Sequence, residues 1–377
     1  MRNSTNNNCG SKVFSFGWMM IAIAIFVALM SGKVFSQAVQ KVESVGFTVS
    51  DMDKAIDFYT RILPFEKVSD KEAWGDELEH LSGVFGARVR VVRLKLGSEI
   101  LELTEYLAST GRPIPVDSRS NDRWFQHIAI IVSDMDKAFE VLRKNRVRFA
   151  STAPQLLPKT IPNAAGIRAF YFKDFDNHVL EILSFPEDKG AQKWHELAKT
   201  DKLFLGIDHT AIVVDDSETS LKFYRDSLGL TVAGMSDNFG TEQEHLNNVF
   251  GAKLHITGLR TAQDGIAVEF LEYLAPRDGK PFPRDTRSND LWHWQTSFTA
   301  PKPEELLSLL RQNRFDLISS GDVLFRENTL GFDNAFLVRD PDGHAVRVVG
   351  KIKTENRNKR LDEDKVAGEQ QKLLRLK

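Results

Sequence analysis

The residues best suited to chemistry in this sequence are histidines and glutamates that stand in apolar, strand-like runs. His127 opens the run H-I-A-I-I-V, and Glu181 lies between Leu180 and Ile182 in the run H-V-L-E-I-L. A carboxylate that points into an apolar core is costly unless a cation or hydrogen bonds satisfy it. Imidazoles and carboxylates are also usual ligands of divalent zinc, iron, manganese and nickel. Because a strand exposes alternate residues, Glu181 has a second interpretation as a side chain that faces water.

The N-terminal segment contains the only cysteine and has the pattern of a signal peptide. The only cysteine, Cys9, precedes an apolar run from Met19 to Met30, and Ser36-Gln37-Ala38 then places small residues at the −3 and −1 positions of a cleavage site. This layout is typical of a secretory signal peptide over residues 1–38 and predicts an exported protein, periplasmic or secreted. The alternative is an uncleaved membrane anchor, because the stretch counted from Val13 to Met30 has 18 residues, close to the length of about 20 residues that a span needs. Loss of Cys9 with the signal would exclude a cysteine nucleophile and Cys-ligated zinc from the mature chain.

Composition narrows the class of partner. The chain has 377 residues, of which 42% are hydrophobic and 27% charged, which is ordinary for a soluble globular protein of two or three domains. A formal net charge of −2 provides no strong field for nucleic acid or for an anionic membrane surface. We therefore expect a small-molecule substrate, no nucleic-acid partner, no membrane partner after signal cleavage, and a monomer or homodimer.

A fourteen-residue block occurs twice. G-R-P-I-P-V-D-S-R-S-N-D-R-W, from Gly111, is nearly repeated as G-K-P-F-P-R-D-T-R-S-N-D-L-W from Gly279, which indicates internal duplication. The favoured interpretation is a structural linker that prolines stiffen and Trp124 anchors by packing. The alternative is functional, with Arg119 and Arg287 reaching an anionic substrate at the mouth of a cleft.

The apolar pattern around this block predicts four units of one design. Alternating runs and Ser-Asp or Asp-Asp helix starts indicate a strand, a helix and then further strands in each unit. The units give a duplicated, antiparallel-rich α+β chain. Its predicted parts are a signal peptide over 1–38, a first domain over 41–185, a linker over 186–205, a second domain over 206–350 and a charged, disordered or loosely helical tail over 351–377.

Four motifs place this design in a known family. H-I-A-I-I-V-S-D-M-D-K-A, I-D-H-T-A-I-V-V, F-K-D-F-D-N-H-V-L-E-I-L and V-R-D-P-D-G-H-A-V-R-V-V resemble the vicinal oxygen chelate (VOC) superfamily, the glyoxalase, bleomycin-resistance and extradiol-dioxygenase group. The resemblance covers about residues 41–350. It implies four βαβββ modules that form two half-barrel, glyoxalase-like VOC domains. It also implies a metal cleft, with one ligand from the first strand and one from the last strand of each module.

The resemblance assigns eight ligand positions. In chain order they are Ser44 and Glu102, His127 and Glu181, His209 and Glu269, and Gln295 and Arg347. Serine is a poor ligand, glutamine a weak one, and arginine repels a cation, so the departures fall in modules 1 and 4. Sequential pairing of modules would give two incomplete sites, whereas crossed pairing, 2 with 3 and 1 with 4, would give one complete site. We carry crossed pairing as a hypothesis, with sequential pairing as the alternative.

The expected function follows from the complete set. His127, Glu181, His209 and Glu269 would hold one divalent ion (Zn, Fe(II), Mn or Ni), and Glu181 and Glu269 are the candidate catalytic carboxylates. The chain would then act on a small oxygen-chelating substrate as a lyase or isomerase, or as a ring-cleaving dioxygenase. The alternative is a non-catalytic protein that binds and sequesters a small molecule, as bleomycin-resistance proteins do, so whether the chain is an enzyme stays open here.

Overall fold

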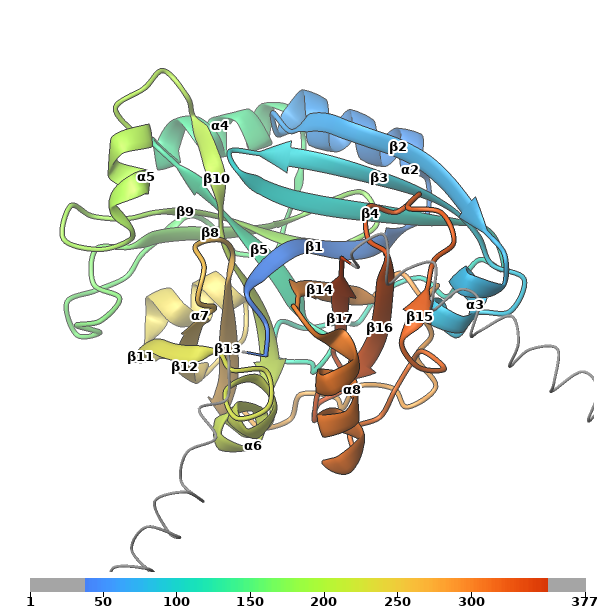
Figure 1. Ribbon diagram of the computed structural model, residues 1–377. Helices are drawn as coiled ribbons and strands as arrows, with labels where there is room; N and C mark the ends of the chain where they lie inside the picture. The colour runs from blue at the N-terminus through green and yellow to red at the C-terminus, as the bar shows by residue number, and fades with distance from the viewer. Residues whose placement is uncertain (1–37, 352–377) are drawn as a thin grey trace, which may run out of the picture. The chain divides into compact units, whose positions relative to one another are not determined.

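The computed structural model describes residues 38–351, which form two curled, mostly antiparallel sheets with helices packed on them (Figure 1). The predicted α+β fold is confirmed. The predicted signal peptide and charged tail lie outside the described residues. Within residues 38–351, no helix combines the length and the apolar character that a membrane span requires.

The chain builds four modules in succession, joined in the middle by a short helix. Module 1 comprises β1 (Lys41–Val49), α2 (Met52–Asp57) with the π-helical turn η1 (Phe58–Ile62), β2 (Glu66–Trp74), α3 (Asp76–Ser82), β3 (Arg88–Leu96) and β4 (Glu99–Ala108). Module 2 comprises β5 (Gln126–Val132), α4 (Met135–Lys144), β6 (Arg148–Phe149), β7 (Gln155–Leu156), β8 (Arg168–Lys173) and β9 (Val179–Ser184). The connector carries α5 (Gln192–Leu197).

The second half repeats this order. Module 3 comprises β10 (Phe204–Val214), α6 (Ser217–Tyr224), β11 (Thr231–Phe239), α7 (Thr241–Asn247), β12 (Lys253–Arg260) and β13 (Ala267–Ala275). Module 4 comprises β14 (Trp294–Thr299), α8 (Pro303–Gln312), β15 (Val323–Leu324), β16 (Asn334–Arg339) and β17 (Ala345–Gly350). The predicted helix starts are confirmed, because the carboxylates of Asp51, Asp134 and Asp216 accept hydrogen bonds from the third backbone amide of α2, α4 and α6.

The strand order pairs the modules crosswise. One sheet runs β15-β16-β17-β14-β1-β4-β3-β2 and joins module 4 to module 1; we call it the 1/4 sheet. The other runs β11-β12-β13-β10-β5-β9-β8-β6 and joins module 3 to module 2; we call it the 2/3 sheet. The crossed-pairing hypothesis is therefore confirmed, and sequential pairing is wrong. Each sequence repeat contributes one module to each sheet.

The two sheets share one hydrophobic core. The largest cluster of buried apolar side chains takes Phe47 and Phe336 from the 1/4 sheet and Ile130 and Phe270 from the 2/3 sheet. Helices of all four modules also contribute to it. In Figure 1, α2 and α4 lie along the top of the view and α6 and α8 at the bottom.

The repeated block ties the two halves of the chain together. Arg112, from the first copy, pairs with Asp290 of the second copy at 2.7 Å, and Lys280 of the second copy pairs with Asp117 of the first at 2.5 Å. Arg119 pairs with Asp278, the residue before the second copy, at 2.8 Å. These reciprocal contacts support the structural interpretation of the block.

In each repeat, one buried tyrosine forms a hydrogen bond between the two modules. The Tyr59 hydroxyl donates to Asp174 at 3.1 Å, and the Tyr224 hydroxyl donates to Asp340 at 3.2 Å. Each aspartate also contacts the histidine four residues later, with 2.8 Å between His178 Nδ1 and Asp174. The F-Y pair of the first helix and the D-x-D-x-H turn of the next module are thus a structural linkage, repeated by pseudo-symmetry.

Candidate metal centre

The central strands of the 2/3 sheet carry the two predicted histidines on one face. β5 and β10 run antiparallel, with His127 opposite Ala211 and His209 opposite Ala129. The small alanines leave room for an imidazole across each pair, and the centroids of the two rings lie 5.8 Å apart. The parallel neighbours β9 and β13 bring Glu181 and Glu269 to the same place.

Three of the four predicted residues converge closely. Glu181 Oε2 lies 3.2 Å from His127 Nε2 and 3.7 Å from His209 Nε2. One ligand atom from each of His127, Glu181 and His209 falls within 4.8 Å of the others, and all three side chains are buried. A group of two imidazoles and one carboxylate with this spacing could hold a divalent cation.

The surroundings of His127 indicate whether this group of residues fits a metal ion. The residue is fully buried, yet neither ring nitrogen makes a hydrogen bond among the described residues, although Nε2 lies within 3.2 Å of Glu181. A buried polar atom without a partner costs about 1–3 kcal/mol. A separation of 3.2 Å without hydrogen-bond alignment is compatible with two ligand atoms that share one cation.

His209 is oriented from behind by its sequence neighbour. Its Nδ1 lies 3.1 Å from Asp208, which leaves Nε2 to face Glu181 and Glu269. Asp208 is itself held by the indole nitrogen of Trp194, which donates to it at 2.8 Å from α5. Carboxylates in this position fix the tautomer of a ligating histidine and raise its basicity.

The charge around His209 favours a cation. Burial lowers the pKa of His209, but the carboxylates of Glu269, Asp208 and Glu181 outweigh burial and raise this pKa to about 9. The same carboxylates that attract a proton would attract a metal ion, which would compete with the proton for the imidazole.

Glu269 differs from the other three predicted residues. Its Oε1 lies 3.7 Å from His209 Nε2, but it stands outside the tight cluster and its side chain is 25% exposed. Burial, followed by the nearby charge of Glu181, raises the pKa of Glu269, whereas His209 opposes the rise. A carboxylate with a raised pKa and access to a cavity is suited to accept a proton.

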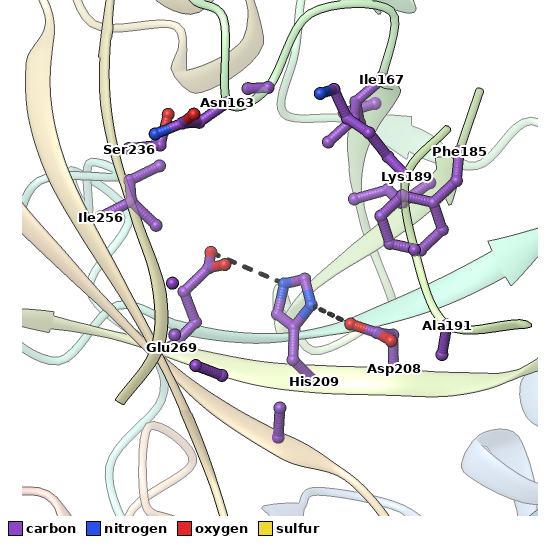
Figure 2. Close-up of a pocket in the computed structure, with 18 of the residues that line it drawn as sticks. Asn163, Ile167, Phe185, Lys189, Ala191, Asp208, His209, Ser236, Ile256 and Glu269 are labelled. Atoms are coloured by element: carbon purple, nitrogen blue, oxygen red, sulfur yellow. Dashed lines mark hydrogen bonds and ion pairs between the residues drawn. The ribbon is translucent and has the colours of Figure 1, made fainter. Parts of the chain in front are cut away.

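The cluster opens into a large cavity. Its volume is about 980 Å³, and Glu181, Asp208, His209 and Glu269 line it. Figure 2 shows His209 between Glu269 and Asp208, with the rim formed by side chains from several strands and loops. That rim combines apolar groups, such as Ile167 and Phe185, with polar ones, such as Asn163, Lys189 and Ser236.

The four corresponding positions of the 1/4 sheet do not form a group of imidazoles and carboxylates. The Arg347 guanidinium contacts Glu102 at 2.7 Å, and Gln295 donates to the same carboxylate at 3.5 Å. The Ser44 hydroxyl is buried and makes no hydrogen bond among the described residues. An arginine therefore neutralises the one carboxylate retained there, and these residues do not fit a metal ion.

Glu105 and Glu272, three residues after Glu102 and Glu269, lie on the other face of their strands. Glu105 accepts a hydrogen bond from Met52 N, and Glu272 accepts one from Ser217 N, at the starts of α2 and α6. The ligand positions that the resemblance assigns to Glu102 and Glu269 agree with this geometry, because Glu105 and Glu272 are held at these helix starts. Sequence reasoning missed Asp208 and Trp194; the acidic residue directly before a histidine in I-D-H was the available signal for Asp208.

Comparison with known protein families identifies the superfamily to which this fold and site belong. A family model described as the glyoxalase/bleomycin resistance protein/dioxygenase superfamily matches residues 41–182 and again residues 206–348. The chain belongs to this superfamily. The two matches coincide with the two sequence repeats, each of which contains two modules.

Two curated relatives within the superfamily are enzymes by name. A 2-epi-5-epi-valiolone epimerase from Actinomyces sp is 34% identical over 166 residues, which span 42% of this chain and 85% of that protein. A lactoylglutathione lyase from Schizosaccharomyces pombe (strain 972 / ATCC 24843) is 27% identical over 199 residues, which span 50% of this chain and 59% of that protein.

A solved structure of the superfamily supports the fold. Glyoxalase I from Zea mays superposes with a TM-score of 0.55 at 15% identity, over 86% of this chain and 95% of that chain. At that identity the likeness concerns the fold alone.

Proposed function

We propose that this superfamily member is a metal-dependent enzyme whose site is the 2/3 sheet cluster. His127, Glu181 and His209 would hold a divalent ion (Zn, Fe(II), Mn or Ni), with Glu269 at its open side. The observation that carries the proposal is the buried imidazole of His127, which makes no hydrogen bond among the described residues although its Nε2 lies 3.2 Å from Glu181 and close to His209. The ion, when bound, would polarise adjacent oxygens of a substrate.

We propose proton transfer next to a carbonyl group as the reaction type, as in an isomerase, epimerase or lyase. Glu269 would accept the proton, because its side chain reaches the cavity and its pKa is raised. Asp208 would hold His209 in place during that transfer. The names of the two curated relatives, an epimerase and a lyase, favour this type over ring-cleaving oxygenation.

The substrate proposed is a small polar molecule with neighbouring oxygens. Lys189, Lys193 and Arg260 line the cavity together with apolar side chains such as Ile167 and Phe185. Cationic side chains suit hydroxyl, carboxylate or phosphate groups, and the apolar wall suits a carbon skeleton. Sequestration of such a molecule without turnover is the competing outcome of the test below.

Export is a separate proposal that the N-terminal pattern supports. Residues 1–38 combine basic residues, an apolar run and a small-residue cleavage pattern. Fractionation of cells followed by N-terminal sequencing would test it, with a new N-terminus at Val39 expected and an intact N-terminus contrary to it.

The reaction is tested by hydrogen exchange and isomerisation. The purified chain, stripped with a chelator and reloaded with Zn, Fe(II), Mn or Ni, is incubated in D₂O with 2-hydroxy ketones, hydroxylated cyclic ketones and thiol adducts of 2-oxoaldehydes. We expect deuterium uptake at the carbon beside the carbonyl group with at least one metal and one substrate class. Glu269→Gln should keep the metal and lose exchange by about 100-fold, the usual effect of removing a general base.

Other results would redirect or reject the proposal. Oxygen consumption with catechols and Fe(II), without deuterium exchange, would replace proton transfer by oxygenation. Tight binding of a substrate with neither exchange nor oxygen uptake would favour a sequestering protein. Full exchange activity in Glu269→Gln would contradict the assignment of Glu269 as the base.

A further inference from the structure

A second cavity lies on the same face of the 2/3 sheet, beyond the metal cluster. Its volume is about 340 Å³ and Phe125 lines it, whereas Tyr171, whose ring centroid lies 5.9 Å from that of Phe125, lines the large cavity. Lys173 lies two residues beyond Tyr171 on β8 and therefore projects from the same face of the sheet. The proposed metal-dependent reaction uses none of the residues that line this second cavity.

Cationic side chains line this cavity. Arg119, Arg148 and Lys173 line it, and among the described residues none of those that line it is acidic. Arg119 is neutralised from outside by Asp278. Arg148 donates only to the backbone carbonyls of Asp174 and Phe175, and Lys173 forms no ion pair within residues 38–351.

The two uncompensated cations face each other across a strand pair. Arg148 of β6 is the direct antiparallel partner of Lys173 of β8. Like charges directly opposite on neighbouring strands destabilise a sheet. Burial, followed by the charge of Arg148, lowers the pKa of Lys173, so the pair is unfavourable as it stands.

Module 4 supplies an internal comparison for this pair. The positions of Arg148 and Lys173 correspond there to Asp316 and Arg339, and the Arg339 amide donates to the Asp316 carbonyl at 2.8 Å. That pair carries opposite charges. The cavity around it is lined by three arginines and four aspartates, namely Arg123, Arg284, Arg339, Asp215, Asp316, Asp340 and Asp342. Module 2 therefore has two cations at positions where module 4 has an opposite-charge pair.

The remaining walls of the cavity suit an organic ligand. Trp124, Phe125, Trp292 and Trp294 provide an aromatic surface, and the side-chain amide of Asn177 adds a hydrogen-bonding group. Aromatic walls bind flat or apolar carbon skeletons, and paired cations bind oxyanions.

We propose that this cavity is a binding site for a small organic anion. A carboxylate or phosphate group would lie between Arg148 and Lys173, and the apolar body would face the aromatic wall. The site is distinct from the proposed metal cleft and does not depend on the reaction proposed there.

Calorimetric and thermal-shift titrations of the purified chain test this site. The probes are benzoate and phenyl phosphate, with neutral benzamide as the uncharged control. We expect saturable binding of benzoate, phenyl phosphate or both, a raised melting temperature, and at least tenfold weaker binding of benzamide, because hydrogen bonds to charged groups are worth about a factor of ten or more. The tighter of the two anions identifies the headgroup class.

Variants separate this site from a general charge effect. Arg148→Asp copies the opposite-charge arrangement of module 4 and should weaken anion binding about tenfold or more while the fold is kept. Lys173→Gln should weaken it similarly and serves if Arg148→Asp does not fold. Lys159→Asp makes the same change of charge at an exposed loop residue outside the cavity and should bind as the wild type does.

Three results would overturn the proposal. The first is no binding of either anion at millimolar concentration. The second is binding of benzamide as tight as that of benzoate, which would indicate a purely apolar pocket. The third is unchanged anion affinity in Arg148→Asp and Lys173→Gln, or an equal loss of affinity in Lys159→Asp.

Discussion

The Arg347 guanidinium lies 2.7 Å from the Glu102 carboxylate, at the position of the 1/4 sheet where the 2/3 sheet places its cluster. Arg347 corresponds to Glu181, and Glu102 corresponds to Glu269. One half-barrel therefore carries its own fixed cation, whereas the other brings two imidazoles and a carboxylate together, and the His127 ring among them makes no hydrogen bond within residues 38–351. This difference is the basis for placing the metal in a single cleft.

Removal of Arg347 should destabilise the fold without affecting the metal. In Arg347→Met, the buried Glu102 would keep the more distant contacts with Arg93 and Gln295, among the residues that the structure describes. Breaking one partner of a buried ion pair usually costs about 3–5 kcal/mol, so we expect the free energy of unfolding to fall by about 3 kcal/mol. Urea unfolding measures this. The double variant Arg347→Met/Glu102→Gln should recover most of the loss, and a double variant no more stable than the single one would contradict the pairing.

Asp208 should control metal affinity through His209 without touching the ion. In Asp208→Asn the charge behind His209 is lost, and we expect affinity for the metal to fall about 10–100-fold, as for other carboxylates behind ligating histidines. Competition with a chromophoric chelator measures the affinity.

The surface pair of His255 and Asp237, 2.7 Å apart, provides the matched control for that prediction. Asp237→Asn removes the same kind of contact away from the cleft and should leave metal affinity unchanged. Equal losses in both variants, or a loss in Asp208→Asn that merely follows reduced stability, would argue against a positioning role for Asp208.

Stability in acid should depend in part on Asp70. Arg90, which donates to Asp70 across β2 and β3, lowers the pKa of this aspartate from 3.8 to about 2. A lowered pKa contributes stability that is fully present above pH 3.8 and is lost as the pH falls through about 2. With both side chains partly exposed, we expect about 1 kcal/mol at pH 6 and about half of it at pH 3. Urea unfolding of wild type and Asp70→Asn across this range should converge as the pH falls; a constant difference would contradict the assignment.

The module design could be predicted from sequence because its strands alternate or run apolar. By contrast, the apolar pattern does not locate β2 and β11. Both lie at sheet edges and are mostly exposed and polar, so no apolar period marks them. The helices α3 and α7, which follow these strands, were missed.

The site could be predicted only in part, because its key relationships are long-range. His127 and His209 stood out as histidines in apolar strands, but nothing local specifies that β5 pairs with β10, since all four modules offer similar first strands. Asp208 lay beside His209 in sequence without revealing that its carboxylate turns toward Nδ1. The opposition of Arg148 and Lys173 joins residues 25 apart across a strand pair that is only two residues long.

The central claim is that the 2/3 sheet holds one divalent ion through His127 and Glu181. Elemental analysis of the purified chain, after exposure to Zn, Mn, Fe(II) and Ni and removal of loose metal, measures this most directly. We predict one ion per chain in the wild type, loss of that ion in His127→Ala and Glu181→Ala, and retention in Ser44→Ala and Gln295→Ala at the corresponding positions of the 1/4 sheet. A wild-type chain without stoichiometric metal, or a His127→Ala variant that keeps it, would contradict the account.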